Sequence, residues 1–336
     1  MSKLALAEEK KPSDEGQHIE SLRIRLLKKI ADDAGDGRMH RDVHVKMHCL
    51  VKAEFIVEPN LPEAFRIGVF AKPRTYKALI RFSNSDGSIK PDRKPDIRGM
   101  AIKLLDVPVT KLLKDEEHEK TQDFILISCP VFPAADVKKF DGIVAAILGG
   151  VWAKLRFFIT NPRVIWILAK TMKKFANPLQ IRYFSTTPYR FGTHAVKYSA
   201  TPLFATPDRI PDAPSDDYLR LAIVNQLQNG EAIFDFGVQL QTDAEAMPVE
   251  DPRVEWPETM SPFRKLATIR ILQQDCDSTQ QAIYGDNLSF TPWHALPEHR
   301  PLGGINRARK VIYEAISRRR HEHNREPRKE PVDWEW

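Results

Sequence analysis

The clearest chemical pattern in the sequence is a tyrosine set between two arginines near the C-terminal end. Arg309 and Tyr313 are four residues apart and Arg320 follows two turns later, so they share one face of a helix predicted over 305–323. Nearby positive charge favours the phenolate form of Tyr313, and phenolate is a good ligand for ferric iron, as in tyrosine-ligated haem. The other arginine could bind a carboxylate. An amphipathic helix whose tyrosine packs at the core edge would show the same spacing.

A histidine before the first predicted strand could move protons. His44 lies in the segment 41–46, which leads into an apolar stretch at 48–58. At the start of a barrel strand its imidazole could point into the barrel and act as an acid–base at neutral pH. His40 and His48 flank it, so a partly buried structural histidine is the alternative.

An arginine and a serine further along could support such a site. Arg81 and Ser83 are two residues apart, so in strand geometry they face the same side of the strand predicted from residue 77. Ser83 could orient a histidine by a hydrogen bond, and Arg81 could bind an anion. A strand with an ordinary mixed face gives the same pattern.

Short strands and several helices must position these residues. About eight strands are predicted at hairpin-like spacing: 48–58, 66–70, 77–82, 99–105, 123–132, 194–200, 231–241 and 265–273. Helices are expected at 19–30, within 134–177, at 216–230 and at 305–323, and an irregular wrapping loop at 288–304. This order favours an α+β fold, an antiparallel eight-stranded β-barrel with inserted and C-terminal helices, over a parallel sheet.

The predicted organisation is one large domain between two tails. The domain spans 17–323, the polar tail at 1–16 is expected to be disordered, and a second tail covers 324–336. The N-terminus shows no apolar signal-peptide region. Three scattered cysteines without a CxxC pair indicate neither a disulfide framework nor a zinc site. We therefore expect a reducing, cytoplasmic compartment.

The net charge of +6 comes largely from arginines between residues 307 and 329. Such a run could bind nucleic acid or an anionic membrane, hold the carboxylates of a cofactor, or form the solvated face of a helix. No zinc-finger or RNP pattern accompanies it, so nucleic acid is not an expected partner.

The apolar stretch 143–172 is a candidate for peripheral membrane contact. Lys154, Arg156 and Arg163 interrupt it, so its longest uncharged run is too short to span a bilayer. The pattern predicts two helices with aromatic faces, broken at Asn161–Pro162. A buried helical pair is favoured over a surface that rests on a membrane.

Taken together and in order, these segments resemble the haem catalase family, in particular its short catalase-like members. Residues 41–46 resemble the family's distal Arg-x-Val-His-x-Lys motif, and 309–313 its proximal Arg-x-x-x-Tyr motif. Further segments agree in the same order: 81–83, 96–103, 130–132, 140, 192–194 and 320. The resemblance spans residues 38–322. It implies the catalase-type barrel, haem b with ferric iron, and activity toward peroxides.

The resemblance also implies how the cofactor is held. Tyr313 would be the proximal ligand of the iron, with Arg309 stabilising its phenolate. Arg41, Arg81 and Arg320 would hold the haem propionates or set the local charge.

On the opposite side of the haem, the resemblance makes His44 the distal acid–base, oriented by Ser83. Val43 would narrow access to the iron, and Phe140 would pack against the haem. The sequence departs from the family where a distal asparagine is expected, and only Ser128 could partly replace that amide. The departure favours peroxidase chemistry over rapid dismutation of hydrogen peroxide.

The leading hypothesis is a haem-dependent peroxidase with weak catalase activity, acting on a peroxide or organic hydroperoxide with an unknown electron donor. One alternative is an enzyme that transforms fatty acid hydroperoxides, similar to the allene oxide synthases of this fold. Another is a non-catalytic haem-binding protein. His294, His299 and Tyr284 are alternative ligands. The resemblance also suggests a homo-oligomer.

Overall fold

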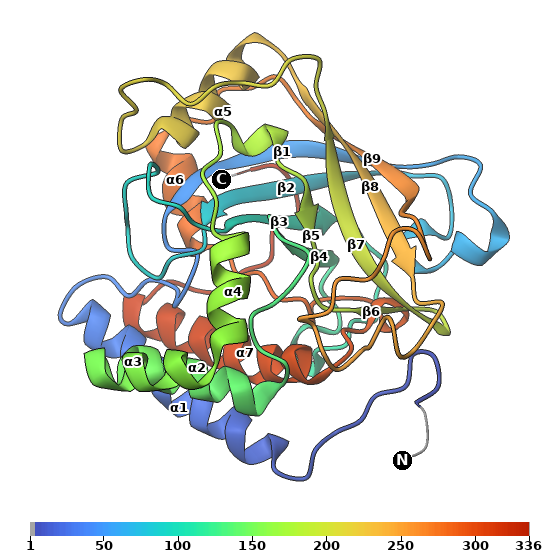
Figure 1. Cartoon of the computed structure of the whole chain (residues 1–336). Coiled ribbons are helices and arrows are strands. Elements are labelled where there is room, and N and C mark those ends of the chain that lie inside the picture. Colours follow the sequence, from blue (N-terminus) through green and yellow to red (C-terminus); the bar gives the residue numbers. More distant parts are fainter. Residues whose placement is uncertain (1–3, 336) are drawn as a thin grey trace.

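An antiparallel β-sheet that closes on itself lies at the centre of the molecule (Figure 1). The computed structural model describes residues 4–335, and these contain nine strands: β1 (Met47–Val57), β2 (Thr75–Asn84), β3 (Arg98–Leu105), β4 (Thr121–Ile127), β5 (Tyr183–Phe184), β6 (Tyr189–Phe191), β7 (His194–Leu203), β8 (Ala232–Leu240) and β9 (Arg264–Ile271). The order is β5-β4-β3-β2-β1-β9-β8-β7, and β5 also pairs with β7, which closes a ring of eight. β6 pairs with β7 outside that ring. The predicted eight-stranded antiparallel barrel is confirmed.

Alternation along the strands decides which side chains fill the barrel. Successive side chains of a strand point to opposite faces. In β2, Ala78, Ile80 and Phe82 lie in the core that fills the barrel. Arg81 and Ser83 therefore point outward, and the outer face of β2 is the surface on which the site must be sought.

One predicted strand is wrong. Residues 66–70 follow the 3₁₀ turn η1 (Glu63–Phe65) and end in a second one, η2 (Gly68–Phe70), and Val69 and Phe70 pack into the barrel core. A short apolar run has the same pattern whether it is a strand or a plug. The ring is closed instead by β5, whose two residues are too few to show a period of two.

Seven α-helices occur in residues 4–335: α1 (Glu15–Ala34), α2 (Val137–Leu148), α3 (Gly150–Thr160), α4 (Pro162–Thr171), α5 (Tyr218–Asn229), α6 (Thr279–Asn287) and α7 (Gly304–Asn324). Helices α1, α2 and α7 form a layer below the barrel in Figure 1. Leu22 and Leu26 of α1 share an apolar core with Ile312 and Ile316 of α7. The predicted helices at the two ends of the domain are confirmed, and each is longer than its pattern.

The inserted helices differ from the expectation of two buried helices in 143–172. The chain breaks at Pro162 as predicted, but also at Gly149–Gly150, where Gly150 adopts a φ of +83°. Phe157 of α3 lies against Gly142 of α2, so α3 folds back along α2. The outer sides of α3 and α4 are exposed rather than buried.

Both terminal segments contact the domain over the residues that the structure describes. In the N-terminal segment, the amide of Ala7 donates to Gln241 at 2.7 Å, and Glu9 forms an ion pair with Arg307 at 2.7 Å. In the C-terminal segment, Glu330 lies 2.6 Å from the buried ammonium of Lys103. These contacts hold both segments against the domain, because each supplies a partner for a buried polar group.

Candidate functional site

His44, Ser83 and Gly99 meet on the outer face of the barrel. Nδ1 of His44 lies 3.0 Å from Oγ of Ser83, and Ser83 pairs with Gly99 between β2 and β3. A Cβ atom on Gly99 would lie 2.6 Å from Nδ1 and Cε1 of His44, so the imidazole rests directly on the glycine backbone. The expected pairing of His44 with Ser83 is present, but the imidazole lies outside the barrel and not within it.

The backbone of His44 has an uncommon conformation. Its φ is +59°, in the left-handed region that costs a residue with a β-carbon about 1–2 kcal/mol. The amide of His44 donates to the carbonyl of Ser85 at 3.2 Å. Lys46, buried two residues later, reaches the carboxylate of Asp92 at 2.8 Å and the carbonyl of Asp216 at 2.7 Å. These contacts fix the segment, and with it the position of the imidazole.

Burial and positive charge keep the imidazole neutral. Burial, followed by the charges of Arg81, Arg41 and Arg309, lowers the pKa of His44 to about 3. At neutral pH the ring therefore has one free nitrogen that can accept a proton. Because Nδ1 is hydrogen-bonded to Ser83, Nε2 is the nitrogen that remains available to a substrate. Arg309 belongs to α7, so this helix lies close enough for its charge to act on His44.

Three buried or half-buried arginines from different elements converge nearby. Arg41 precedes β1, Arg81 lies in β2, and Arg320 lies in α7. All three donate to carbonyls of the segment 285–289: the Asp286 carbonyl accepts from Arg41 at 2.8 Å and from Arg320 at 2.5 Å, and the first carbonyl of the segment accepts from Arg81 at 3.3 Å. Among the described residues, Nε of Arg41 is buried without a hydrogen-bond partner. The cluster thus has donor capacity for an anion.

The charges of this cluster repel one another. Burial and neighbouring guanidiniums lower the pKa of Arg41 to about 9, that of Arg81 to about 10 and that of Arg320 to about 9. Burial opposes the ionisation of Asp286, but a hydrogen bond from His40 and the charges of Arg41 and Arg81 hold the pKa of Asp286 below its ordinary value. With three guanidiniums around one carboxylate, a bound carboxylate would be stabilised here.

Arg309 and Tyr313 lie one turn apart on α7, as predicted. Arg309 donates to Oγ1 of Thr187 at 3.1 Å and to Oδ1 of Asn306 at 3.3 Å, and its guanidinium lies 5.7 Å from the ring centre of Phe132. Tyr313 is half-buried and packs against the core shared by α1 and α7. Neutral acceptors, the hydroxyl of Thr187 and the amide oxygen of Asn306, thus hold Arg309 one turn before Tyr313.

Half-buried apolar side chains line the outer barrel face beside His44. Phe140 of α2 meets Phe132 edge to face, with ring centres 5.3 Å apart. Val43 is 43% exposed. Three outward positions of β3 and β4 next to Gly99 are apolar and half-buried: Ala101, Ile125 and Ile127. Apolar residues on an outward row indicate a surface that is covered by another apolar group.

Ser128 directly follows β4. Its Oγ accepts a hydrogen bond from the amide of Arg98 at 2.9 Å and keeps its own proton as a donor. With Cys129 it lines a separate cavity of about 320 Å³, bounded by α4 and by residues 253–255. Burial raises the pKa of the Cys129 thiol to about 12, which keeps it in the unreactive protonated form.

The alternative ligands lie in other parts of the molecule. His299 is buried among the aromatic residues of the barrel core, and Tyr284 packs in a separate apolar cluster. His294 forms a group with Glu116 and Glu330 whose ligand atoms lie within 4.8 Å of one another. Lysine and arginine side chains pair with both carboxylates, so the charge of this group is balanced without a metal ion.

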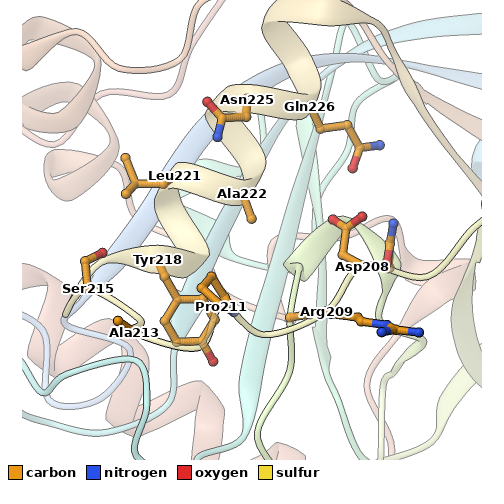
Figure 2. Close-up of a pocket in the computed structure, with 12 residues that line it drawn as sticks. Asp208, Arg209, Pro211, Ala213, Ser215, Tyr218, Leu221, Ala222, Asn225 and Gln226 are labelled. Atoms are coloured by element: carbon orange, nitrogen blue, oxygen red, sulfur yellow. The ribbon is translucent and has the colours of Figure 1, made fainter.

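A cavity of about 760 Å³ lies between α5 and the loop 208–215. Figure 2 shows Asn225 and Gln226 of α5 above the loop that carries Asp208 and Arg209. None of the predicted site residues lines it. Asp208 and Gln226 already accept hydrogen bonds from Asn177, both at 2.8 Å. The cavity therefore adds no chemistry to the site.

The described residues fit a haem group. The unpartnered nitrogen of Arg41 and the net charge of the arginine cluster suit two propionates, the apolar outer row suits a porphyrin face, and Tyr313 offers a phenol oxygen. Gly99 and Phe132 lie in the segments 96–103 and 130–132 that carry the resemblance, but the sequence assigned no role to either, and Asp286 was not singled out. Their roles depend on contacts between distant segments.

Three catalases are among the solved structures that are similar to this chain. A fungal catalase has a TM-score of 0.67 at 17% identity, a bacterial catalase 0.66 at 18%, and catalase A from Saccharomyces cerevisiae 0.65 at 19%. They cover 88%, 88% and 89% of this chain, which spans only 62%, 60% and 63% of theirs. No family model and no curated protein matches the sequence. The closed barrel, the helical layer and these likenesses together show that the chain has the catalase fold.

Proposed function

We propose that this protein binds ferric haem b and reduces peroxides with it, as a peroxidase with weaker catalase activity. One observation carries the proposal: the His44–Ser83 pair on the outer barrel face lies within reach of the charge of Arg309, one turn from Tyr313 on α7. The likeness to catalases supports the fold on which this arrangement is built.

The residues of the chain divide into those that would hold the cofactor and those that would serve the substrate. Tyr313 would ligate the iron, and Arg41, Arg81 and Arg320 would bind the propionates through their free donors. Bound haem supplies the metal centre at which the oxygen–oxygen bond of a peroxide is cleaved. The protein must then bind the peroxide above it and move one proton.

His44 is suited to move that proton. Its ring is neutral at neutral pH, so Nε2 can take the proton from the hydroperoxide and return it to the leaving oxygen. The hydrogen bond between Nδ1 and Ser83 holds the ring in one orientation during the transfer. The contact with the backbone of Gly99 prevents the ring from moving closer to the barrel wall.

The proposal is tested by reconstituting the purified protein with ferric haem and following its spectrum as peroxide is added. His44→Ala should retain haem but lose about 10²–10⁴-fold in peroxide turnover, the usual contribution of a positioned acid–base. His118→Ala is the matched control, because the side chain of His118 is 88% exposed. Full turnover in His44→Ala would refute the assignment.

The ligand is tested separately. Tyr313→Phe removes one phenol oxygen and keeps the apolar ring, so the fold should be retained while ferric-haem affinity falls or the spectrum loses its tyrosinate character. Tyr284→Phe serves as the control, because Tyr284 packs in a different cluster. An unchanged spectrum in Tyr313→Phe would show that another residue binds the iron.

A second candidate function is the transformation of fatty acid hydroperoxides. The position of Ser128 favours it, since this residue stands where the family's distal amide is expected and lines a separate cavity of about 320 Å³. Turnover of hydrogen peroxide and of a long-chain fatty acid hydroperoxide should be compared in the same preparation. Preference for the fatty substrate, without a requirement for an electron donor, would support this second function over the first.

A further inference from the structure

Helices α3 and α4 expose apolar side chains along one side of the molecule. We define the α3–α4 face by residues that share a high exposure: Val151, Trp152, Leu155, Ile159, Ile165 and Trp166. Trp152 is 82% exposed and Trp166 61% exposed. Large apolar residues normally appear singly on a protein surface, so six of them on two consecutive helices, including two tryptophans, indicate an interaction surface.

The face is presented by helices that are firmly packed on their other side. Phe157 and Phe158 of α3 and Val164 of α4 belong to, or pack against, an apolar cluster that includes Ile143 and Ile305. A Cβ atom on Gly142 would lie 3.2 Å from the ring of Phe157, which shows how closely α2 and α3 approach. The exposed residues are therefore held outward by a folded core behind them.

The charged side chains that α3 and α4 themselves carry are all cations, although Glu255 lies beside α4. No carboxylate occurs in the sequence from residue 142 to 207, whereas 142–176 contain six cations: Lys154, Arg156, Arg163, Lys170, Lys173 and Lys174. Within residues 4–335 none of these six forms an ion pair. The ammonium of Lys170 lies 5.2 Å from the ring centre of Trp166, so charge and aromatic surface are interleaved.

We propose that the α3–α4 face docks the protein on an anionic lipid bilayer. Tryptophan and aliphatic side chains suit the boundary between headgroups and acyl chains, and interleaved lysine and arginine suit the phosphates above it. A second copy would bring six cations against six, so self-association through this face is disfavoured. The described helices include none long and apolar enough to cross a membrane, so the contact is with its surface.

One residue of the α3–α4 face also lines a cavity. Trp166, with Arg163 and Lys170, borders the cavity of about 320 Å³ that reaches Val131 and Cys129. Its lining combines cations and apolar side chains with one carboxylate, that of Glu255. The proposal does not depend on haem, and its test needs no enzymatic activity.

The test is the sedimentation of the full-length protein with vesicles. Vesicles of phosphatidylcholine with about 30% phosphatidylglycerol should bind the protein, and binding should fall as salt screens the attraction. Trp152→Ser with Trp166→Ser should weaken partitioning by about tenfold or more, since each removes a large apolar side chain from the interface. Lys154→Glu with Lys170→Glu should abolish the preference for phosphatidylglycerol.

Matched controls come from exposed apolar residues elsewhere. Ile89 is 69% exposed and Val332 is 92% exposed, so Ile89→Ser and Val332→Ser should bind vesicles like the unmodified protein. Circular dichroism checks that every variant is folded. Equal binding by the tryptophan variant, or equal binding to pure phosphatidylcholine, would overturn the proposal. The proposal would also be overturned if the protein did not bind vesicles but formed a dimer, or a complex with an acidic protein, that the same tryptophan substitutions disrupt.

Discussion

At the scale of single residues, the site depends on how little room His44 has. The left-handed backbone aims the imidazole toward β2 and β3, Ser83 binds one nitrogen, and the bare backbone of Gly99 lies below the ring. A side chain at any position on which the imidazole rests would move it. Proton transfer is sensitive to such a displacement, because donor and acceptor must meet within about 3 Å.

We predict that Gly99→Ala uncouples haem binding from turnover. The added methyl group would lie 2.6 Å from the His44 ring and 2.9 Å from Oγ of Ser83, so the ring must shift. A displacement of this kind costs on the order of a hundredfold in turnover. Ferric-haem affinity should be unchanged. Gly16→Ala is the control, because no atom lies within 4 Å of its added carbon.

Sequence reasoning found His44, Ser83, Arg309 and Tyr313 because each belongs to a short pattern with fixed spacing. It placed Gly99 in a matching segment but could not assign its role, since that role lies in an atom that is missing and in a contact across two strands. The hydrogen bond from the Arg98 amide to Ser128 was likewise not visible, because it depends on the path of the chain after β4.

At the scale of elements, the arginine cluster shows how separate segments share one function. A segment before β1, strand β2 and helix α7 each supply one guanidinium, and the end of α6 supplies the carbonyls and Asp286. The cluster therefore links four elements around a single charge balance. A substitution of Asp286 should therefore lower the stability of the fold more than it changes the reaction.

We predict that Asp286→Asn lowers the free energy of unfolding of the haem-free protein by about 1–2 kcal/mol, because the three guanidiniums lose a compensating charge. Urea denaturation measures the loss, and added salt should reduce it by screening the repulsion. Ferric-haem affinity should be kept or increased. Asp106→Asn is the control, since Asp106 pairs with Arg74 at the surface with 73% of its side chain exposed. A loss that salt does not change would contradict the electrostatic explanation.

The element pattern of the sequence predicted most of the barrel, for a physical reason. Long strands such as β1, β2 and β8 alternate because one row faces the core and the other faces outward. The pattern failed where length or burial removed the alternation. β5 is too short, and Val69 and Phe70 are buried without belonging to a strand.

At the scale of the whole molecule, the C-terminal segment is held by a buried ion pair. The side chain of Glu330 is 6% exposed and lies 2.6 Å from the fully buried ammonium of Lys103. Burial alone would raise the pKa of Glu330, but the charges of Lys103 and His294 outweigh this effect and hold the pKa below its ordinary value. We predict that Glu330→Gln costs about 2–3 kcal/mol of unfolding free energy. Asp333→Asn, which breaks the exposed pair with Lys77, should cost much less because water screens that pair. Similar losses in thermal or urea unfolding would argue against the buried pair as the cause.

The stability of the whole protein should decline in mild acid. His299 is buried in the barrel, where its Nε2 accepts a hydrogen bond from the amide of Val69 at 3.1 Å. Burial lowers the pKa of His299 to about 3. Between pH 6.5 and that value the unfolded chain binds the extra proton, so stability is full above pH 6.5 and falls below it by about 1.4 kcal/mol per pH unit. His299→Asn should make the decline less steep by that amount. Urea denaturation at pH 7 and at pH 5.5 measures this decline. An equal loss of unfolding free energy between these pH values in His299→Asn and in the unmodified protein would contradict the explanation.

The brief seam at β5 has a consequence for the dynamics of the barrel. Tyr183 and Phe184 join β4 through one residue pair and β7 through two, whereas the other neighbours in the ring share five or more. Amide protons at this junction should exchange with deuterium sooner than those of β1 or β8, because local opening there breaks the fewest bonds. Such local opening would transiently release the end of β4 at Ile127 from β5. The apolar outer barrel face beside His44 would then pack less tightly, while the rest of the ring stayed closed.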